Sequence, residues 1–160
     1  LSGGEAQRIA LSTCLGSSLV GSTYILDEPS IGLHPADTER LIGVLHHLRD
    51  IGNTVVVVEH DEHIMAAADH LIDMGPGAGS LGGQLIFSGA RAELDALPED
   101  HPSWTAAYLT GRKSIPVPLS RRAVTQKMSL TDGRLHTLKG VAADFPLHAM
   151  TVVTGVSGSG

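Results

Sequence analysis

Two adjacent carboxylates, Asp27 and Glu28, follow the apolar run at residues 23–26 and come directly before Pro29. Because Pro lacks a backbone N–H group, a buried strand should end there, with both carboxylates at its carboxyl end. Ligands of open α/β sheets bind at that edge. One carboxylate can hold Mg²⁺ through water, and the next, on the opposite side of the strand's end, can polarise an attacking water. A solvated strand end with no chemical role is the alternative.

A second expected strand, residues 54–59, is almost uniformly apolar and ends in a cluster of five polar residues, Glu59, His60, Asp61, Glu62 and His63. Its His and carboxylate content is compatible with a metal site. The segment should instead continue into a helix over residues 61–68, since acidic residues suit the positive end of a helix. His60 is then placed like Asp27 and Glu28, where a neutral imidazole can hydrogen-bond a terminal phosphate or the attacking water.

The first residues combine a helix start with glycines. Ser2 followed by Glu5 forms a capping box, which predicts a helix over residues 3–15. Gly3 and Gly4 weaken a first turn but let a phosphate approach the free N–H groups of a helix N-terminus. Ser2, Gly3 and Gly4 are therefore candidate phosphate contacts, and a merely well-capped helix is the alternative.

The last residues also combine a strand with glycines. An expected strand over residues 150–154 leads into Gly155, Val156, Ser157, Gly158, Ser159 and Gly160. A strand that feeds a glycine-rich loop is the beginning of a P-loop, whose backbone N–H groups cradle phosphates. The Lys and Ser/Thr that complete this pattern would follow Gly160. The glycines at residues 75–83 lack them too and are expected to form a structural loop.

The elements that position these residues alternate between strands and helices, which predicts an α/β fold. Residues 36–50 have helical spacing, with Leu41, Val44, Leu45 and Leu48 on one face. His46 and His47 in that helix are expected to be surface or packing residues. The further expected elements are strands at residues 70–74, 84–88, 128–131 and 140–145, and helices at residues 91–97 and 104–109.

Composition is that of an ordinary globular chain of 160 residues, with 42% hydrophobic and 18% charged residues. No apolar run reaches the roughly 18 residues of a membrane span, and no signal peptide is recognisable. Cys14 is the only cysteine, which excludes a disulfide within the chain and a Cys-rich zinc cluster. These features suit a cytoplasmic protein. The chain has no initial Met and stops abruptly, so we expect it to be a fragment.

Charge divides the chain. Residues 1–111 carry 4 Lys and Arg against 15 Asp and Glu, a net charge of −11, whereas residues 112–160 carry 7 against 2, a net charge of +5. The change of sign predicts a domain boundary near Gly111. The basic, Pro-containing residues 112–125 are expected to form a linker. It would pack on the acidic part of the chain as a tether, and contact with phosphate or DNA is the alternative.

Three motifs in this order and spacing resemble those of ABC-type ATPases. Residues 1–5 resemble the ABC signature, residues 26–30 resemble Walker B with the start of the D-loop, and His60 resembles the switch histidine. Within these ATPases the chain resembles the UvrA family of bacterial nucleotide excision repair. The matching segments are residues 27–35, 58–61, 73–79, 82–83, 111–112, 115–118 and 153–160.

The resemblance implies a partial ABC-ATPase domain, with parallel central strands flanked by helices, and the β-rich start of a second ABC module. Residues 1–111 would end the first nucleotide-binding domain, and residues 126–160 would begin the second. It also implies that Glu28 is the general base, that Asp27 holds Mg²⁺ and that His60 senses the γ-phosphate. The signature residues Ser2, Gly3 and Gly4 would serve ATP bound on the loop that begins at Gly155.

The resemblance further implies ATP and Mg²⁺ as cofactors, and DNA, a UvrB-like helicase and a second copy of the parent protein as partners, with no membrane. Zinc is expected in the parent but not in this segment. The parent would hydrolyse ATP, whereas the 160-residue chain alone would not. The alternatives are another ABC ATPase, such as a drug-resistance paralogue, a transporter or a translation factor, and a module that uses ATP only to dimerise.

Overall fold

The structure is a computed structural model that describes residues 20–156 and 159. These residues fall into two compact units. The first comprises the described residues up to Gly32 and Thr38–Ile115, and the second comprises Leu33–Asp37 and the residues from Pro116 onward. The predicted helix at residues 3–15 lies outside the described residues.

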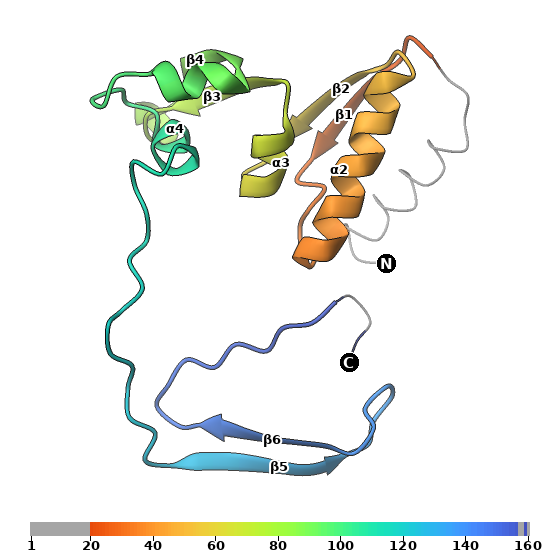
Figure 1. Cartoon of the computed structure of the whole chain (residues 1–160), viewed down its shortest axis with the longest axis vertical. Helices are drawn as coiled ribbons and strands as arrows, with labels where there is room; N and C mark the ends of the chain where they lie inside the picture. The colour runs from red at the N-terminus through yellow and green to blue at the C-terminus, as the bar shows by residue number, and fades with distance from the viewer. Residues whose placement is uncertain (1–19, 157–158, 160) are drawn as a thin grey trace. The chain divides into compact units, whose positions relative to one another are not determined.

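The elements follow one another in chain order as Figure 1 labels them. They are β1 (Thr23–Asp27), α2 (Pro35–Asp50), β2 (Thr54–Val58), α3 (Glu62–Ala67), β3 (His70–Gly75), η1 (Gly79–Leu81), β4 (Gln84–Ala90), η2 (Arg91–Ala96), α4 (Trp104–Leu109), β5 (Lys127–Gly133) and β6 (Val141–Pro146).

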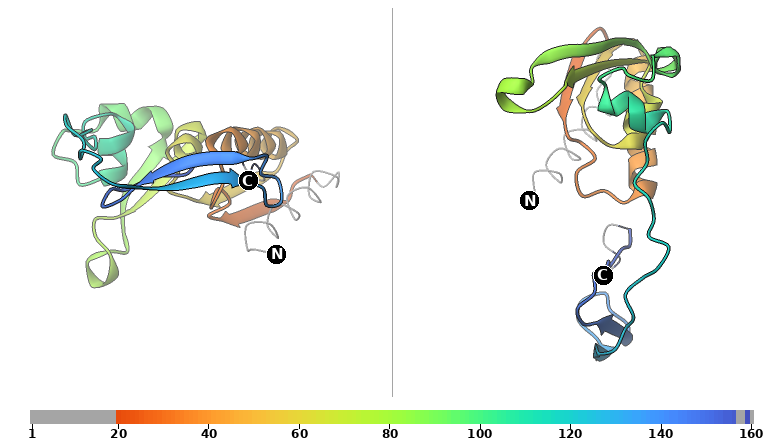
Figure 2. Two further views of the ribbon diagram at one scale, coloured as in Figure 1. Left: turned by 90° about the horizontal axis from the view of Figure 1, so that it is seen from below. Right: turned by 90° about the vertical axis from the view of Figure 1, so that its left-hand side faces the viewer.

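Strands β1 and β2 form the parallel pair of the first unit, with Asp27 opposite Val58. Parallel neighbours need a crossover connection, and α2 provides it. Figures 1 and 2 show this helix alongside the pair. It buries Leu41, Leu45 and Leu48, whereas Val44 of the predicted face is only half-buried. The α/β expectation is confirmed in this β1–α2–β2 unit.

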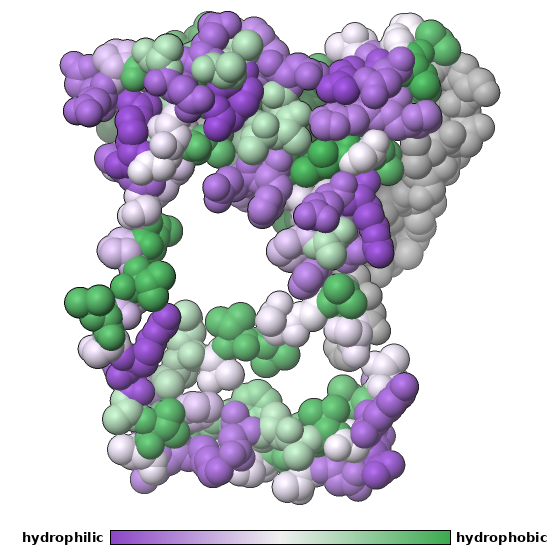
Figure 3. All heavy atoms as spheres, viewed as in Figure 1, coloured by the Kyte–Doolittle hydropathy of each residue, from purple (hydrophilic) through white to green (hydrophobic). Residues whose placement is uncertain are grey.

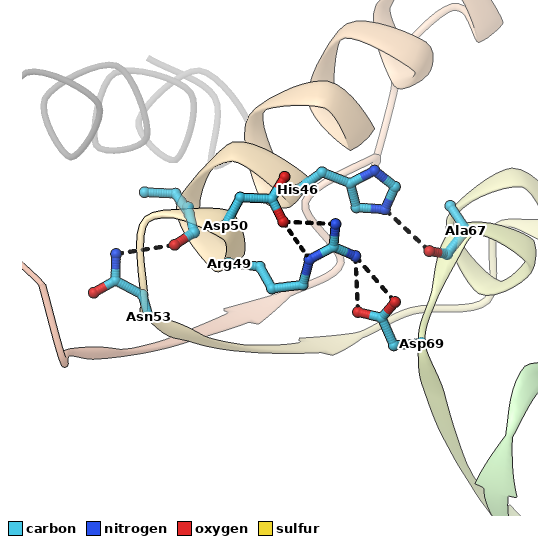
Figure 4. Close-up of polar contacts among 7 residues, drawn as sticks. His46, Arg49, Asp50, Asn53, Ala67 and Asp69 are labelled. Atoms are coloured by element: carbon cyan, nitrogen blue, oxygen red, sulfur yellow. Dashed lines mark hydrogen bonds and ion pairs between the residues drawn. The ribbon is translucent and has the colours of Figure 1, made fainter.

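Hydrogen bonds connect the end of α2 to the last residue of α3 and to Asp69, which follows it, as Figure 4 shows. The Arg49 guanidinium donates to both carboxylate oxygens of Asp69, at 3.0 and 2.8 Å. The hydrogen bond to Asp69, with that to Asp50, raises the pKa of Arg49. His46 Nε2 lies 3.0 Å from the Ala67 carbonyl oxygen. His47 is exposed, so the expectation that His46 and His47 are surface or packing residues is confirmed.

The expectation of several parallel central strands is wrong for β3. The described residues form three two-stranded sheets, and β3 pairs with β4 in antiparallel orientation. The reason is the short connection through η1, which makes a hairpin and cannot cross over to a parallel position. This hairpin packs on η2 and α4 around Phe87, Leu94 and Ala106.

The helix expected over residues 91–97 is present at Arg91–Ala96, as a 3₁₀ helix. One further expectation needs correction. Residues 150–154 were expected to form a strand, yet they have no regular secondary structure. In the described part of the second unit, β5 and β6 pair with each other in antiparallel orientation. Residues 150–154 have no pairing partner in the part of the chain that the structure describes, so they make no ladder hydrogen bonds and are irregular.

The basic segment at residues 112–125 has no helix or strand. Its apolar side chains Ile115, Val117 and Leu119 are exposed, and Figure 3 shows green side chains interspersed with purple ones along it. No helix among the described residues is long and apolar enough to cross a membrane.

Candidate functional site

The carboxyl ends of β1 and β2 bring the first candidate residues together. The register places Asp27 opposite Val58, and the backbone N–H of Glu28 donates to the Val58 carbonyl oxygen at 2.9 Å. Glu28 and His60 therefore follow the carboxyl ends of two hydrogen-bonded strands and lie at the same edge of the sheet. His60 Nδ1 lies 3.7 Å from Glu28 Oε1.

This contact is open to solvent. The side chain of His60 is 81% exposed and that of Glu28 is 47% exposed. The separation of the two atoms exceeds that of a hydrogen bond. A carboxylate and an imidazole thus lie side by side in contact with solvent, and together they can orient a water molecule against a phosphate.

Glu28 adopts a backbone conformation that is rare for its residue type. Its φ is +44°, in the left-handed region. This region is disfavoured for residues with a Cβ and persists where surrounding contacts impose it. Here the Glu28 N–H is held by Val58, and the Glu28 carbonyl accepts from the Ile31 N–H at 3.1 Å. The chain therefore turns sharply at the carboxylate expected to be the general base.

Glu59 is a residue of this edge that sequence reasoning did not assign. Its Oε1 accepts from the Ser30 N–H at 2.8 Å, and its Oε2 accepts from the N–H groups of His60 and Asp61 at 2.9 and 3.2 Å. Partial burial acts to raise the pKa of Glu59, but hydrogen bonds outweigh it and lower the pKa, first from the Ser30 side chain and then from the N–H groups of Ser30, His60 and Asp61. The available signal was the parallel between Asp27-Glu28 and Glu59-His60, two polar pairs at neighbouring strand ends.

The polar cluster after β2 continues into a helix, as predicted. Asp61 is the N-cap of α3, and its carboxylate accepts from the N–H groups of His63 and Ile64 at 2.9 and 3.2 Å. Within the described residues no group of three or more His, Cys, Asp or Glu side chains is arranged to hold a metal ion. The cluster at residues 59–63 therefore caps a helix.

Asp27 fits the type of Mg²⁺ site expected with a nucleotide. It is the last residue of β1, at the edge where Glu28 and His60 lie. Mg²⁺ in such sites is held by one or two carboxylates together with water and substrate phosphates, so a full cage of protein ligands is not needed. The donor chemistry of Asp27 suits that ion.

Of the glycine-rich candidates, Gly155 and Ser159 are described. The Ser159 N–H donates to the Val156 carbonyl at 3.0 Å. A Cβ added at Gly155 would lie 2.5 Å from Ser159 Oγ. The close approach suits glycine at this position. The other candidates of the two glycine-rich segments, Ser2, Gly3, Gly4, Ser157, Gly158 and Gly160, lie outside the described residues.

Three basic residues of the predicted linker make contacts within their own units. Arg112 donates to the Pro98 carbonyl at 2.7 Å, and the Lys113 ammonium lies 3.6 Å from the centre of the Trp104 ring. Arg122 donates to the His148 carbonyl at 3.3 Å. These contacts favour packing as their role.

Comparison with known proteins finds similar sequences in UvrABC system protein A of two staphylococci. The whole chain is 56% identical to a segment of UvrABC system protein A from Staphylococcus aureus (strain COL) and 53% identical to one from Staphylococcus epidermidis. The chain spans 17% of the length of these relatives. No protein-family model matches it.

A solved structure is similar to this chain in both sequence and fold. The crystal structure of UvrA2 from Deinococcus radiodurans is 44% identical and has a TM-score of 0.88. The similarity covers 99% of this chain and 19% of that one.

Proposed function

Because this chain belongs to the UvrA family along its whole length, we propose that it is part of an ABC-type ATPase that recognises DNA damage in nucleotide excision repair. The observation that carries the ATPase role is the approach of His60 to Glu28, at 3.7 Å, where two parallel strands end. Such an edge is where open α/β sheets bind their ligands.

In this proposal Glu28 orients and deprotonates the attacking water, and His60 contacts the γ-phosphate. Asp27 would hold Mg²⁺ through water, and when bound the ion would supply positive charge to neutralise the phosphate groups. Phosphoryl transfer depends on positioning and charge stabilisation more than on covalent catalysis.

The remaining residues complete the proposal. Residues 1–111 end one nucleotide-binding domain, residues 112–125 link it to the next, and residues 126–160 begin the second. Ser2, Gly3 and Gly4 contact the nucleotide held by the loop at Gly155, Ser157, Gly158, Ser159 and Gly160. The whole protein acts in the cytoplasm on DNA, with a UvrB-like helicase, as a homodimer.

A second candidate is a UvrA-like paralogue with a role other than general repair, because the matched solved structure is a UvrA2. Both candidates use the same ATP chemistry. They differ in whether the whole protein restores repair of ultraviolet damage in cells that lack their own UvrA.

The test of the ATPase role uses the full-length protein that carries this segment. Glu28→Gln should keep ATP binding at this site and lower hydrolysis there by about 10²- to 10⁴-fold, the usual loss for a general base. Glu39→Gln, on the exposed side of α2, is the matched control and should leave hydrolysis unchanged. Unchanged single-turnover hydrolysis in Glu28→Gln would show that Glu28 is not the base.

A further inference from the structure

Glu59 connects the two loops that leave the candidate site. It follows β2 directly, and its carboxylate reaches Ser30 in the loop after β1 and also accepts from His60 and Asp61 in its own loop. Ser30 is two residues beyond Glu28. One side chain therefore holds the backbone on both sides of the Glu28–His60 contact.

The chemistry of this position calls for a carboxylate. An ionised carboxylate accepts hydrogen bonds only, and its two oxygens have enough lone pairs for three N–H donors. A glutamine at this position would have one accepting oxygen, and its amide NH₂ would face N–H groups. Hydrogen bonds to an ionised acceptor are also the stronger kind. The lowered pKa of Glu59 agrees with a side chain that is ionised in place.

We propose that Glu59 is a positioning residue for ATP hydrolysis, which fixes the loop after Glu28 relative to the backbone of His60 so that both groups face one nucleotide. The proposal rests on the proposed function. Glu59 makes its contacts through backbone N–H groups, and Glu28 and His60 carry out the chemistry. A shift of about 1 Å in reacting groups can cost about 10² in rate, so this fixing has a kinetic consequence.

The experiment measures, in the full-length protein, the ATP hydrolysis that is lost in Glu28→Gln. Glu59→Gln should lower kcat for this hydrolysis by about 10- to 100-fold, with a much smaller change in KM for ATP. Two Glu→Gln controls separate the causes. Glu62→Gln removes the same charge at the exposed start of α3, and Glu93→Gln alters another acceptor, which bonds the Ala90 N–H at 3.2 Å. Both controls should keep the wild-type kcat.

A double-mutant cycle with His60→Ala distinguishes positioning from general destabilisation. If Glu59 acts through His60, adding Glu59→Gln to His60→Ala should cost much less than Glu59→Gln costs alone. Losses that multiply would overturn the proposal. Glu59→Asp, which keeps the charge and both acceptor oxygens, should recover part of the kcat lost in Glu59→Gln, and it is the variant to use if Glu59→Gln does not fold.

The outcomes separate the two proposals. If Glu28→Gln has no effect on hydrolysis, the proposed function fails. If Glu28→Gln lowers hydrolysis while Glu59→Gln and Glu59→Asp behave like the two controls, the proposed function stands and the role of Glu59 is overturned.

Discussion

Two regions are expected to bind nucleotide, the β1–β2 edge and the glycine-rich loop that begins at Gly155. They differ in whether contacts within the region hold their residues in place. At the β1–β2 edge, a parallel neighbour and the Glu59 hydrogen bonds bring Glu28 and His60 together. Before Gly155, residues 150–154 form no strand, and Met150, Val152 and Val153 are exposed. The difference teaches that a strand-end site takes shape only where the strand has a partner. The apolar run before Gly155 is as strand-like in sequence as β1 but has no such partner among residues 20–156.

The largest expected effect concerns which nucleotide each region serves. In the full-length protein, Gly4→Asp would place a carboxylate against the γ-phosphate held by the loop at Gly155, and repulsion should disable that site. Glu28→Gln should disable the other site, by about 10²- to 10⁴-fold. Single-turnover assays should therefore find different residual sites in the two variants.

A double variant should lose both activities, and Gly4→Ala, which adds no charge, is the control for Gly4→Asp. If Gly4→Asp and Glu28→Gln silence the same site, the assignment of the two regions to different nucleotides is wrong.

The next effect concerns the stability of the two regions in the 160-residue chain. Leu48 is 0% exposed, so Leu48→Ala should lower the free energy of opening of the β1–β2 amides by about 2–5 kcal/mol. Leu130 in β5 is 42% exposed, and Leu130→Ala should lower that of the β5–β6 amides by less than about 1 kcal/mol. Amide hydrogen exchange measures both. Equal losses would show that the hairpin is as well supported as the β1–β2 edge.

A smaller effect is expected from the basic residues at the predicted linker. Replacing Arg112, Lys113, Arg121 and Arg122 by Gln should change the log–log salt slope of DNA binding by the full-length protein by less than about 0.9, one phosphate contact. The reason is that Arg112, Lys113 and Arg122 already contact protein groups. A change equal to three or four contacts would assign this segment to the DNA.

The smallest effect is a pH dependence confined to the hairpin. Hydrogen bonds from Lys127 and then Ser129 lower the pKa of Asp144 from its ordinary value of 3.8. Stabilisation by Asp144 should be complete above 3.8 and lost as the pH falls through the lower folded-state pKa. Hydrogen exchange of β5–β6 amides over this pH window should show the loss. Asp144→Asn should remove it, and a loss that persists in Asp144→Asn would point to another group.

The end or start of a strand or helix could be predicted from the sequence where a single residue type stops or caps it. Pro29 predicted the end of the first strand, and Asp61 predicted the start of α3. Placement of Glu28 and His60 at one edge followed from the rule that parallel strands end together, and the structure brings them within 3.7 Å. These inferences needed only chain direction and residue type.

What could not be predicted depends on pairing. The sequence predicts a strand at residues 70–74, but the partner and direction of that strand are set by the short connection to β4. The role of Glu59 depends on the register of β1 against β2 together with the turn at Glu28, which brings the Ser30 N–H within 2.8 Å. No periodicity in the sequence encodes that distance.

The left-handed backbone at Glu28 has a consequence for selection and engineering. Asn and Gly adopt this conformation more readily than Glu, so either substitution should relieve strain on the order of 1 kcal/mol while removing the proposed base. A library ranked by thermal resistance should therefore enrich Asn or Gly at position 28, and one ranked by ATP turnover should retain Glu. The two rankings should therefore differ at position 28, where Glu lowers thermal stability and supports ATP turnover.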